Sequence, residues 1–211
     1  MDLEALKIDI LKTALADIPF DGWTLNAFKA AAVKLEHDEV MIDALFPQGI
    51  HDTLKTFSYW IDQDTSRILN DIDTTDMRVR DRVSLGVQKR IETLSPYKDS
   101  IRESAKILAT PNYLRLGAQM TWDSSDMIWN WAGDTATDYN RYTKRGLLSG
   151  VIGSTMLYWL QDDSENFEKT THFLNRRIDN VLFIGKNIAP LIKPVASLFE
   201  RFIVPKKSGE K

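Results

Sequence analysis

Residues 24–61 read TLNAFKAAAVKLEHDEVMIDALFPQGIHDTLKTFSYWI, and this stretch gives the clearest indication of the fold. Its apolar residues recur at the spacing of amphipathic helices. Thr24 can cap a first helix and Asp38 a second, very short one, because both side chains accept hydrogen bonds from helix amides. The sequence Phe46-Pro47-Gln48-Gly49 then ends the short helix, and a long helix is expected from about Ile50. The stretch predicts two short helices followed by a long one.

The same spacing continues in both directions from this stretch. Upstream, an N-terminal helix is expected to end at Pro19-Phe20-Asp21-Gly22. Downstream, prolines, glycines and capping residues separate further helices, which are expected over residues 78–94, 98–108, 113–132, 137–160 and 164–184. No segment alternates apolar and polar residues as a strand would. We therefore predict an all-α chain.

The order of the first helices resembles the DNA-binding domain of TetR-type repressors, whose third helix enters the major groove. In this chain that helix and its lead-in carry carboxylates at Glu36, Asp38, Glu39 and Asp43. Such charges would repel DNA phosphates, so we expect no nucleic-acid binding. A simpler reading is a solvated helix start that complements the helix dipole. A TetR-type ligand-responsive transcriptional regulator is kept as the alternative function.

A TetR-like chain with a degenerate helix-turn-helix would keep the other half of that architecture, an apolar ligand tunnel between helices and a dimer interface. No internal repeat or low-complexity linker interrupts the helical pattern. We expect a degenerate helix-turn-helix subdomain over residues 1–48 and a helical lipid-binding and dimerisation domain over 49–184. Residues 185–211 are expected to form a C-terminal amphipathic helix and tail.

Composition narrows the function classes further. The 211 residues are 43% hydrophobic, with 27 basic and 30 acidic side chains and a net charge of −3, so no basic field favours nucleic acid. The absence of cysteine excludes disulfides, thiolate metal sites and thiol nucleophiles. We see no signal peptide, no transit peptide and no apolar run long enough to span a membrane. Membrane contact is therefore expected to be peripheral.

Known catalytic patterns are missing. The histidines His37, His51 and His172 stand in neither an E-x-x-H nor an H-x-x-x-H arrangement, and no phosphate-binding, dinucleotide-binding or nucleophile-elbow glycine motif occurs. Neighbouring acids such as Asp162 and Asp163 are more often helix caps than catalytic pairs. We predict no enzyme, no metal and no cofactor. A lipid-modifying enzyme is a third hypothesis, and it would need turnover without any added hydroxylase.

The most distinctive stretch is SDMIWNWAGDTATDYNRYTKR, residues 125–145. Gly133 is expected to be the left-handed residue that ends one helix, and Asp134 or Thr137 to cap the next. The pattern W-x-x-A-G-D-x-x-x-D-x-N-x-Y-T-K-R closely resembles the coenzyme Q nine family, TetR-fold accessory proteins of ubiquinone biosynthesis. Residues 19–24 (PFDGWT) and 160–178 (LQDDSENFEKTTHFLNRRI) resemble two further segments of that family. The resemblance covers residues 6–184.

This resemblance implies a homodimer that holds isoprenoid or another lipid and docks the di-iron demethoxyubiquinone hydroxylase, which supplies the iron. The family's surface patch for that enzyme, with the residues before it, corresponds here to Trp129, Gly133, Asp134, Asp138, Asn140, Tyr142, Lys144 and Arg145. Animal members have a tryptophan where this chain has Arg141. Trp129 and Gly133 can alternatively be read as residues that only shape the turn. For the polar positions we favour an interaction surface, because such side chains are seldom chosen for a core.

The lipid tunnel is expected among apolar residues of the later helices. Its candidate lining residues are Leu116, Met120, Met127, Val151, Met156, Trp159 and Phe173. Methionine suits an adaptable lipid site because its side chain is flexible and polarizable. Each of these residues can alternatively be plain core, which is the commoner fate of an apolar helix stripe.

The tail from residue 184 carries a broad apolar stripe at helical spacing. The candidate membrane-binding residues in it are Ile188, Leu191, Ile192, Val195, Leu198, Phe199, Phe202 and Ile203. Basic residues outnumber acidic ones in this tail although the whole chain is acidic, which favours a helix lying in a membrane interface over one packed on the domain. We expect a cytoplasmic protein held peripherally at the inner membrane of a bacterium, or on the matrix side in a mitochondrion.

Overall fold

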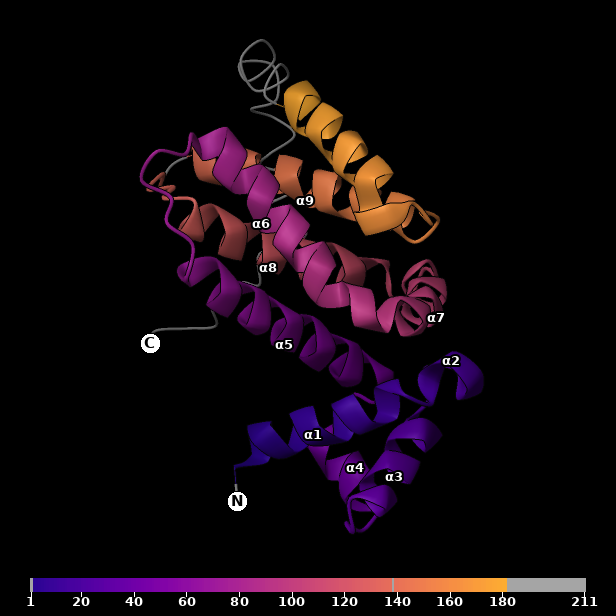
Figure 1. Ribbon diagram of the computed structural model, residues 1–211. Coiled ribbons are helices and arrows are strands. Elements are labelled where there is room, and N and C mark those ends of the chain that lie inside the picture. The colour runs from indigo at the N-terminus through magenta and orange to yellow at the C-terminus, as the bar shows by residue number, and fades with distance from the viewer. Residues whose placement is uncertain (1, 138, 182–211) are drawn as a thin grey trace, which may run out of the picture. The chain divides into compact units, whose positions relative to one another are not determined.

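The computed structural model describes residues 2–137 and 139–181, except the side chain of Tyr139. Over these residues the secondary structure is helical, with no strand (Figure 1). The chain divides into two compact units, Met1–Arg67 with Glu92–Met120, and Ile68–Ile91 with the chain from Thr121 onward. The domain boundary expected after residue 48 stays a prediction. The tail residues expected to bind membrane lie outside the described residues.

The first unit begins with the expected short helices. They are α1 (Leu3–Leu15), α2 (Ile18–Asp21), α3 (Leu25–Lys34) and α4 (Met41–Leu45). Thr24 caps α3 as predicted, since its hydroxyl accepts a hydrogen bond from the amide of Ala27 at 3.3 Å. The one-turn helix α2 was not predicted, and it forms because Pro19 occupies its first turn, where a missing amide costs nothing.

The turn between α3 and α4 differs from the expected one in a detail. Glu36 has a φ of +60°, so the chain reverses in the left-handed region. The carboxylate of Asp38 accepts from the amide of Val40 at 2.9 Å, but the helix itself begins only at Met41. Asp38 therefore stabilises the turn rather than capping the helix. Glu36, Asp38, Glu39 and Asp43 are all exposed.

An aromatic cluster holds the short helices to the long helix α5 (Ile50–Asn70). Trp23 packs edge-on against Phe57 with ring centroids 5.4 Å apart, and Phe28 packs against Phe46 at 5.8 Å. The indole of Trp23 donates to the hydroxyl of Thr53 at 2.9 Å, which satisfies the polar atom of a buried ring. The 3₁₀ turn η1 (Ser95–Tyr97), α7 (Lys98–Leu108) and the start of α8 (Leu114–Trp131) complete this unit.

The second unit contains most of α6 (Val79–Leu94), the later part of α8, α9 (Tyr139–Trp159), the 3₁₀ turn η2 (Glu165–Phe167) and a helix over residues 168–181. Gly86 of α6 sits directly against Ile128 of α8, and a Cβ there would approach the Ile128 side chain to 2.7 Å. Ser84 donates to Asn175 at 2.9 Å and Arg80 to Asp179 at 3.0 Å. These contacts tie α6 to α8 and to the last described helix. Among the described residues, none of the helices has the length and hydropathy that a transmembrane span requires.

Candidate functional site

The distinctive stretch forms a sharp corner between α8 and α9, built on a left-handed glycine. Gly133 has a φ of +88°, as predicted, and its amide donates to the carbonyl of Asn130 at 3.1 Å. The amide of Asp134 reaches back to the carbonyl of Trp129 at 3.0 Å. This pair of bonds is a Schellman motif, which satisfies the last carbonyls of α8. The corner is therefore set by local chemistry that the sequence displays.

Arg145 of α9 lies inside this corner with only 1% of its surface exposed. Its guanidinium donates to the carboxylate of Asp126, to that of Asp134 at 2.9 Å and to the amide oxygen of Asn130 at 3.0 Å. Its own carbonyl accepts from the hydroxyls of Ser125 at 3.0 Å and Ser149 at 2.7 Å. A buried charge is tolerated only when it is paired and hydrogen-bonded in this way. Arg145 therefore joins α8, the turn and α9.

Two further cations complete the cluster, one on each carboxylate. The ammonium of Lys144 donates to Asp134 at 2.6 Å and lies 5.3 Å from the centre of the Trp129 ring. The guanidinium of Arg141 donates to Asp126 at 3.1 Å. Burial alone would raise the pKa of Asp134, but the hydrogen bonds from Lys144 and Arg145 outweigh it and hold that pKa below its usual value. Asp134 is therefore a stable anion within the corner.

The aromatic residues of the corner also have partners. The indole of Trp129 donates to the carbonyl of Lys144 at 3.1 Å, so this ring bridges α8 and α9. Tyr142 stacks on Trp122 with ring centroids 6.3 Å apart. Asn140 is exposed, and the side chain of Lys144 keeps 41% of its surface accessible. Only some of the residues predicted to bind a protein partner therefore have exposed side chains at the corner.

The structure brings together most of the residues expected to bind a protein partner, but it does not expose them all. Arg145 and the side chain of Asp134, which is 3% accessible, lie inside. The argument that polar types at these positions indicate surface was wrong for these two residues, because their charges neutralise each other in the interior. Asp138 lies outside the described residues. Partner binding by the set as a whole stays a prediction.

The late segment that resembles the family, residues 160–178, contains a hydrogen-bonded turn centred on one carboxylate. The buried carboxylate of Asp162 accepts from the amide and hydroxyl of Ser164, at 2.9 and 2.6 Å, and from the amide and hydroxyl of Thr170, at 2.8 and 2.6 Å. Burial acts to raise its pKa, but these donors outweigh burial and hold the pKa far below the usual value. Phe167 packs edge-on against the buried Trp159. The D-x-S-x-x-F-x-x-T pattern thus folds the turn that leads into the last described helix.

The residues expected to line a lipid tunnel fall in both units. Leu116 and Met120 belong to the first unit and the others to the second. Val151 and Trp159 are buried, at 3% and 0% exposure. Phe173 is stacked on Tyr158 with centroids 4.4 Å apart and lies 5.0 Å from the guanidinium carbon of Arg177. These placements suit core as well as tunnel, and lipid contact stays a prediction.

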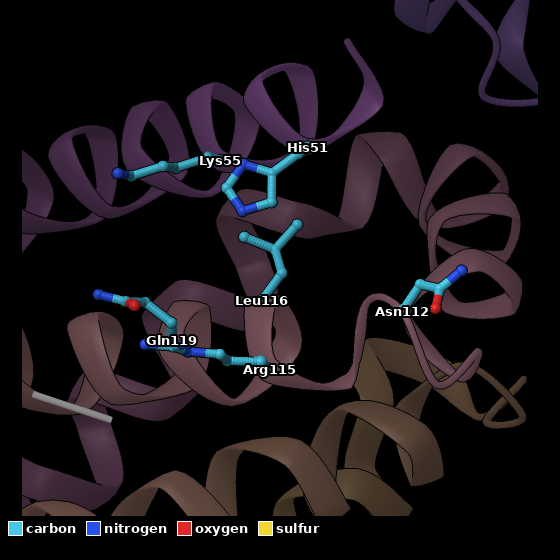
Figure 2. Close-up of a pocket in the computed structure, with 6 residues that line it drawn as sticks. All are labelled: His51, Lys55, Asn112, Arg115, Leu116 and Gln119. Atoms are coloured by element: carbon cyan, nitrogen blue, oxygen red, sulfur yellow. The ribbon is translucent and has the colours of Figure 1, made fainter. Parts of the chain in front are cut away.

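A cavity that the sequence did not predict lies within the first unit. It measures about 290 Å³ and is lined by His51, Lys55, Asn112, Arg115, Leu116 and Gln119 (Figure 2). It is polar apart from Leu116, because α5 faces the start of α8 here with long polar side chains. Leu116 is the one predicted lipid residue that lines it. Among the described residues no group of histidines and carboxylates is arranged to hold a metal ion.

The comparison with solved structures concerns the fold. It is a TetR-like all-α fold: the solved TetR transcriptional regulator from Nitrosomonas europaea matches with a TM-score of 0.66 over 85% of this chain and 99% of its own. The two sequences are 14% identical, so this likeness shows the fold alone.

The particular resemblance is to COQ9, as the corner motif indicated. Residues 114–185, which contain the whole α8–α9 corner, match the COQ9 family model. The human mitochondrial ubiquinone biosynthesis protein COQ9 is 28% identical over 86% of this chain and 59% of its own length. That of Xenopus tropicalis is 28% identical over 95% of this chain and 64% of its own. This chain spans about three fifths of the curated relatives that it matches.

Proposed function

We propose that this chain is a non-catalytic accessory protein of ubiquinone biosynthesis that binds an isoprenoid or quinone lipid and presents it to a di-iron hydroxylase. The observation that carries this proposal is the match of residues 114–185 to the COQ9 family. The matched segment is the one in which α8 and α9 meet. The α8–α9 corner is the proposed docking surface, and the two proposed roles can be tested separately.

The corner supports a docking role through its geometry. Its buried ion pairs between Arg145 and two aspartates give a rigid support, and Asn140 and Lys144 are accessible on top of it. Rigid placement of exposed polar groups lowers the entropy lost on binding. The ammonium of Lys144, which lies beside the Trp129 ring, offers a positive charge that is complementary to an acidic partner surface.

Docking is tested with the purified full chain and the purified hydroxylase by titration calorimetry. Lys144→Met removes the accessible cation while Arg145 still neutralises Asp134. We expect about a tenfold weaker Kd from this variant, the size typical of one lost interfacial charge. Lys169→Met, which removes an exposed lysine of the same unit, is the matched control and should leave the Kd unchanged. Equal affinities for the two variants would argue against docking at the corner.

Lipid binding is tested by mass spectrometry of lipids that co-purify with the full chain. Isoprenoid or quinone species recovered at a fixed ratio to protein would support the proposal. Recovery of detergent alone would contradict it. A membrane role for the tail is tested by flotation with liposomes, comparing the full chain with a chain ending at Gly185, and equal flotation of the two would contradict that role.

A further inference from the structure

The cavity between α5 and the start of α8 carries a positive charge that nothing in the proposed function uses. Lys55 and Arg115 line it, and no carboxylate is among its lining residues. Within residues 2–137 and 139–181 neither cation forms an ion pair. Other exposed cations of the same unit do, such as Lys106 with Glu103 at 2.7 Å and Arg67 with Asp64 at 2.7 Å. Two unneutralised cations on one cavity attract an anion.

The neutral groups of the cavity can complete such a site. Asn112 and Gln119 offer amide donors, and His51 offers a ring nitrogen. The Nδ1 atom of His51 is buried and has no hydrogen-bond partner among the described residues, and a carboxylate oxygen of Asp52 lies 3.6 Å from it. Buried polar atoms normally have a partner, so this nitrogen is a further indication of a missing ligand.

The arrangement of the side chains restricts the ligand's shape. Figure 2 shows Lys55, Arg115 and Gln119 extending in the same direction across the cavity, with Asn112 at the other end and Leu116 between them. The volume of about 290 Å³ is at the small end of ligand pockets. The neighbouring Asp52 accepts a hydrogen bond from the amide of Gln48 at 2.8 Å, and its single negative charge cannot neutralise both cations.

We propose that the cavity lined by His51, Lys55, Asn112, Arg115 and Gln119 binds a phosphate or diphosphate group. A phosphoryl group presents several oxygens to donors in different directions, and an arginine and a lysine are its usual protein partners. The group belongs either to a free small molecule or to a lipid whose headgroup enters the cavity. This inference does not rest on the proposed function, because it uses only the first unit and none of the α8–α9 corner.

Two probes are used. Inorganic diphosphate represents a free phosphate compound, and a water-soluble short-chain phosphatidic acid represents a lipid headgroup. Each is titrated calorimetrically into the full chain at constant ionic strength. We expect saturable binding of diphosphate that weakens about tenfold in Lys55→Met and in Arg115→Gln, as for the loss of one charge-assisted hydrogen bond. Lys106→Met and Arg67→Gln, which remove the same charges from ion-paired surface positions of the same unit, should bind as the unaltered chain does.

The relative affinities of the two probes distinguish a lipid headgroup from a free phosphate compound. Tighter binding of short-chain phosphatidic acid than of diphosphate, lost in the same two variants, assigns the site to a lipid headgroup, and the reverse order assigns it to a free phosphate compound. All variants alter exposed side chains, and unchanged far-UV circular dichroism confirms that they fold. No saturable binding of either probe, or equal binding by Lys55→Met and Lys106→Met, would overturn the proposal.

Discussion

Arg145 provides the sharpest test of the α8–α9 corner, because its charge is buried and its partners are known. Replacing it with methionine keeps the aliphatic stem but leaves Asp126 and Asp134 without their shared cation. Removing one member of a buried pair costs about 3–5 kcal/mol. Since Lys144 still reaches Asp134 and the Asp126 side chain is 30% accessible, we expect the low end, about 3 kcal/mol.

Urea unfolding followed by circular dichroism measures this change. With a typical urea slope of about 2 kcal/mol per molar, Arg145→Met should lower the midpoint by about 1.5 M. Arg141→Met is the matched control: it removes the same charge from the same partner, Asp126, but at a side chain that is 40% exposed, so it should cost no more than about 1 kcal/mol. If the two variants unfolded at the same urea concentration, the reasoning that the buried cation holds the corner would be refuted.

Gly133, Asp162 and the carboxylates before α4 can each be tested as well. Gly133→Ala should cost about 1 kcal/mol or more in urea unfolding because its φ is +88°, whereas Gly150→Ala, in an open position of α9, should stabilise the chain slightly. The pKa of Asp162 is lowered in the folded state, so the stability that its carboxylate contributes is present above the unfolded pKa, near 3.8, and is lost as the pH falls below that value. Asp162→Asn should therefore be less stable than the unaltered chain at pH 7. Between pH 7 and pH 3 the variant should lose less of its free energy of unfolding than the unaltered chain does. Gel shifts at low salt should show no saturable DNA binding, because Glu36, Asp38 and Glu39 are exposed around the turn before α4.

Much of the fold could be predicted from the sequence because its signals are local. Thr24 caps α3, Gly133 ends α8 in the left-handed region, and α7 spans Lys98–Leu108 as expected. Each of these features depends on residues a few positions apart. The short helix α2 could not be predicted from Pro19 alone, because proline breaks a helix interior but also suits a first helical turn.

The burial of Arg145 could not be predicted in the same way. Its partner Asp126 is nineteen residues away, and only the folded corner shows that both carboxylates point to one guanidinium. The cavity near His51 was missed for the same reason, since it combines residues 51–55 with residues 112–119. One signal was available: Arg115 has no acid three or four positions away, as a solvated helical arginine often has.

These structural roles determine how the binding defects of corner variants should be interpreted. Arg145, Asp134 and Gly133 hold the corner together, so a variant at any of them that fails to bind the proposed hydroxylase partner is equally explained by loss of the corner's fold. Lys144 and Asn140 differ, because the side chain of Lys144 is 41% accessible and Asn140 is exposed. Loss of binding in Lys144→Met with an unchanged urea midpoint would therefore be evidence for contact. The same loss in Arg145→Met, with the midpoint lowered, would be evidence only for the scaffold.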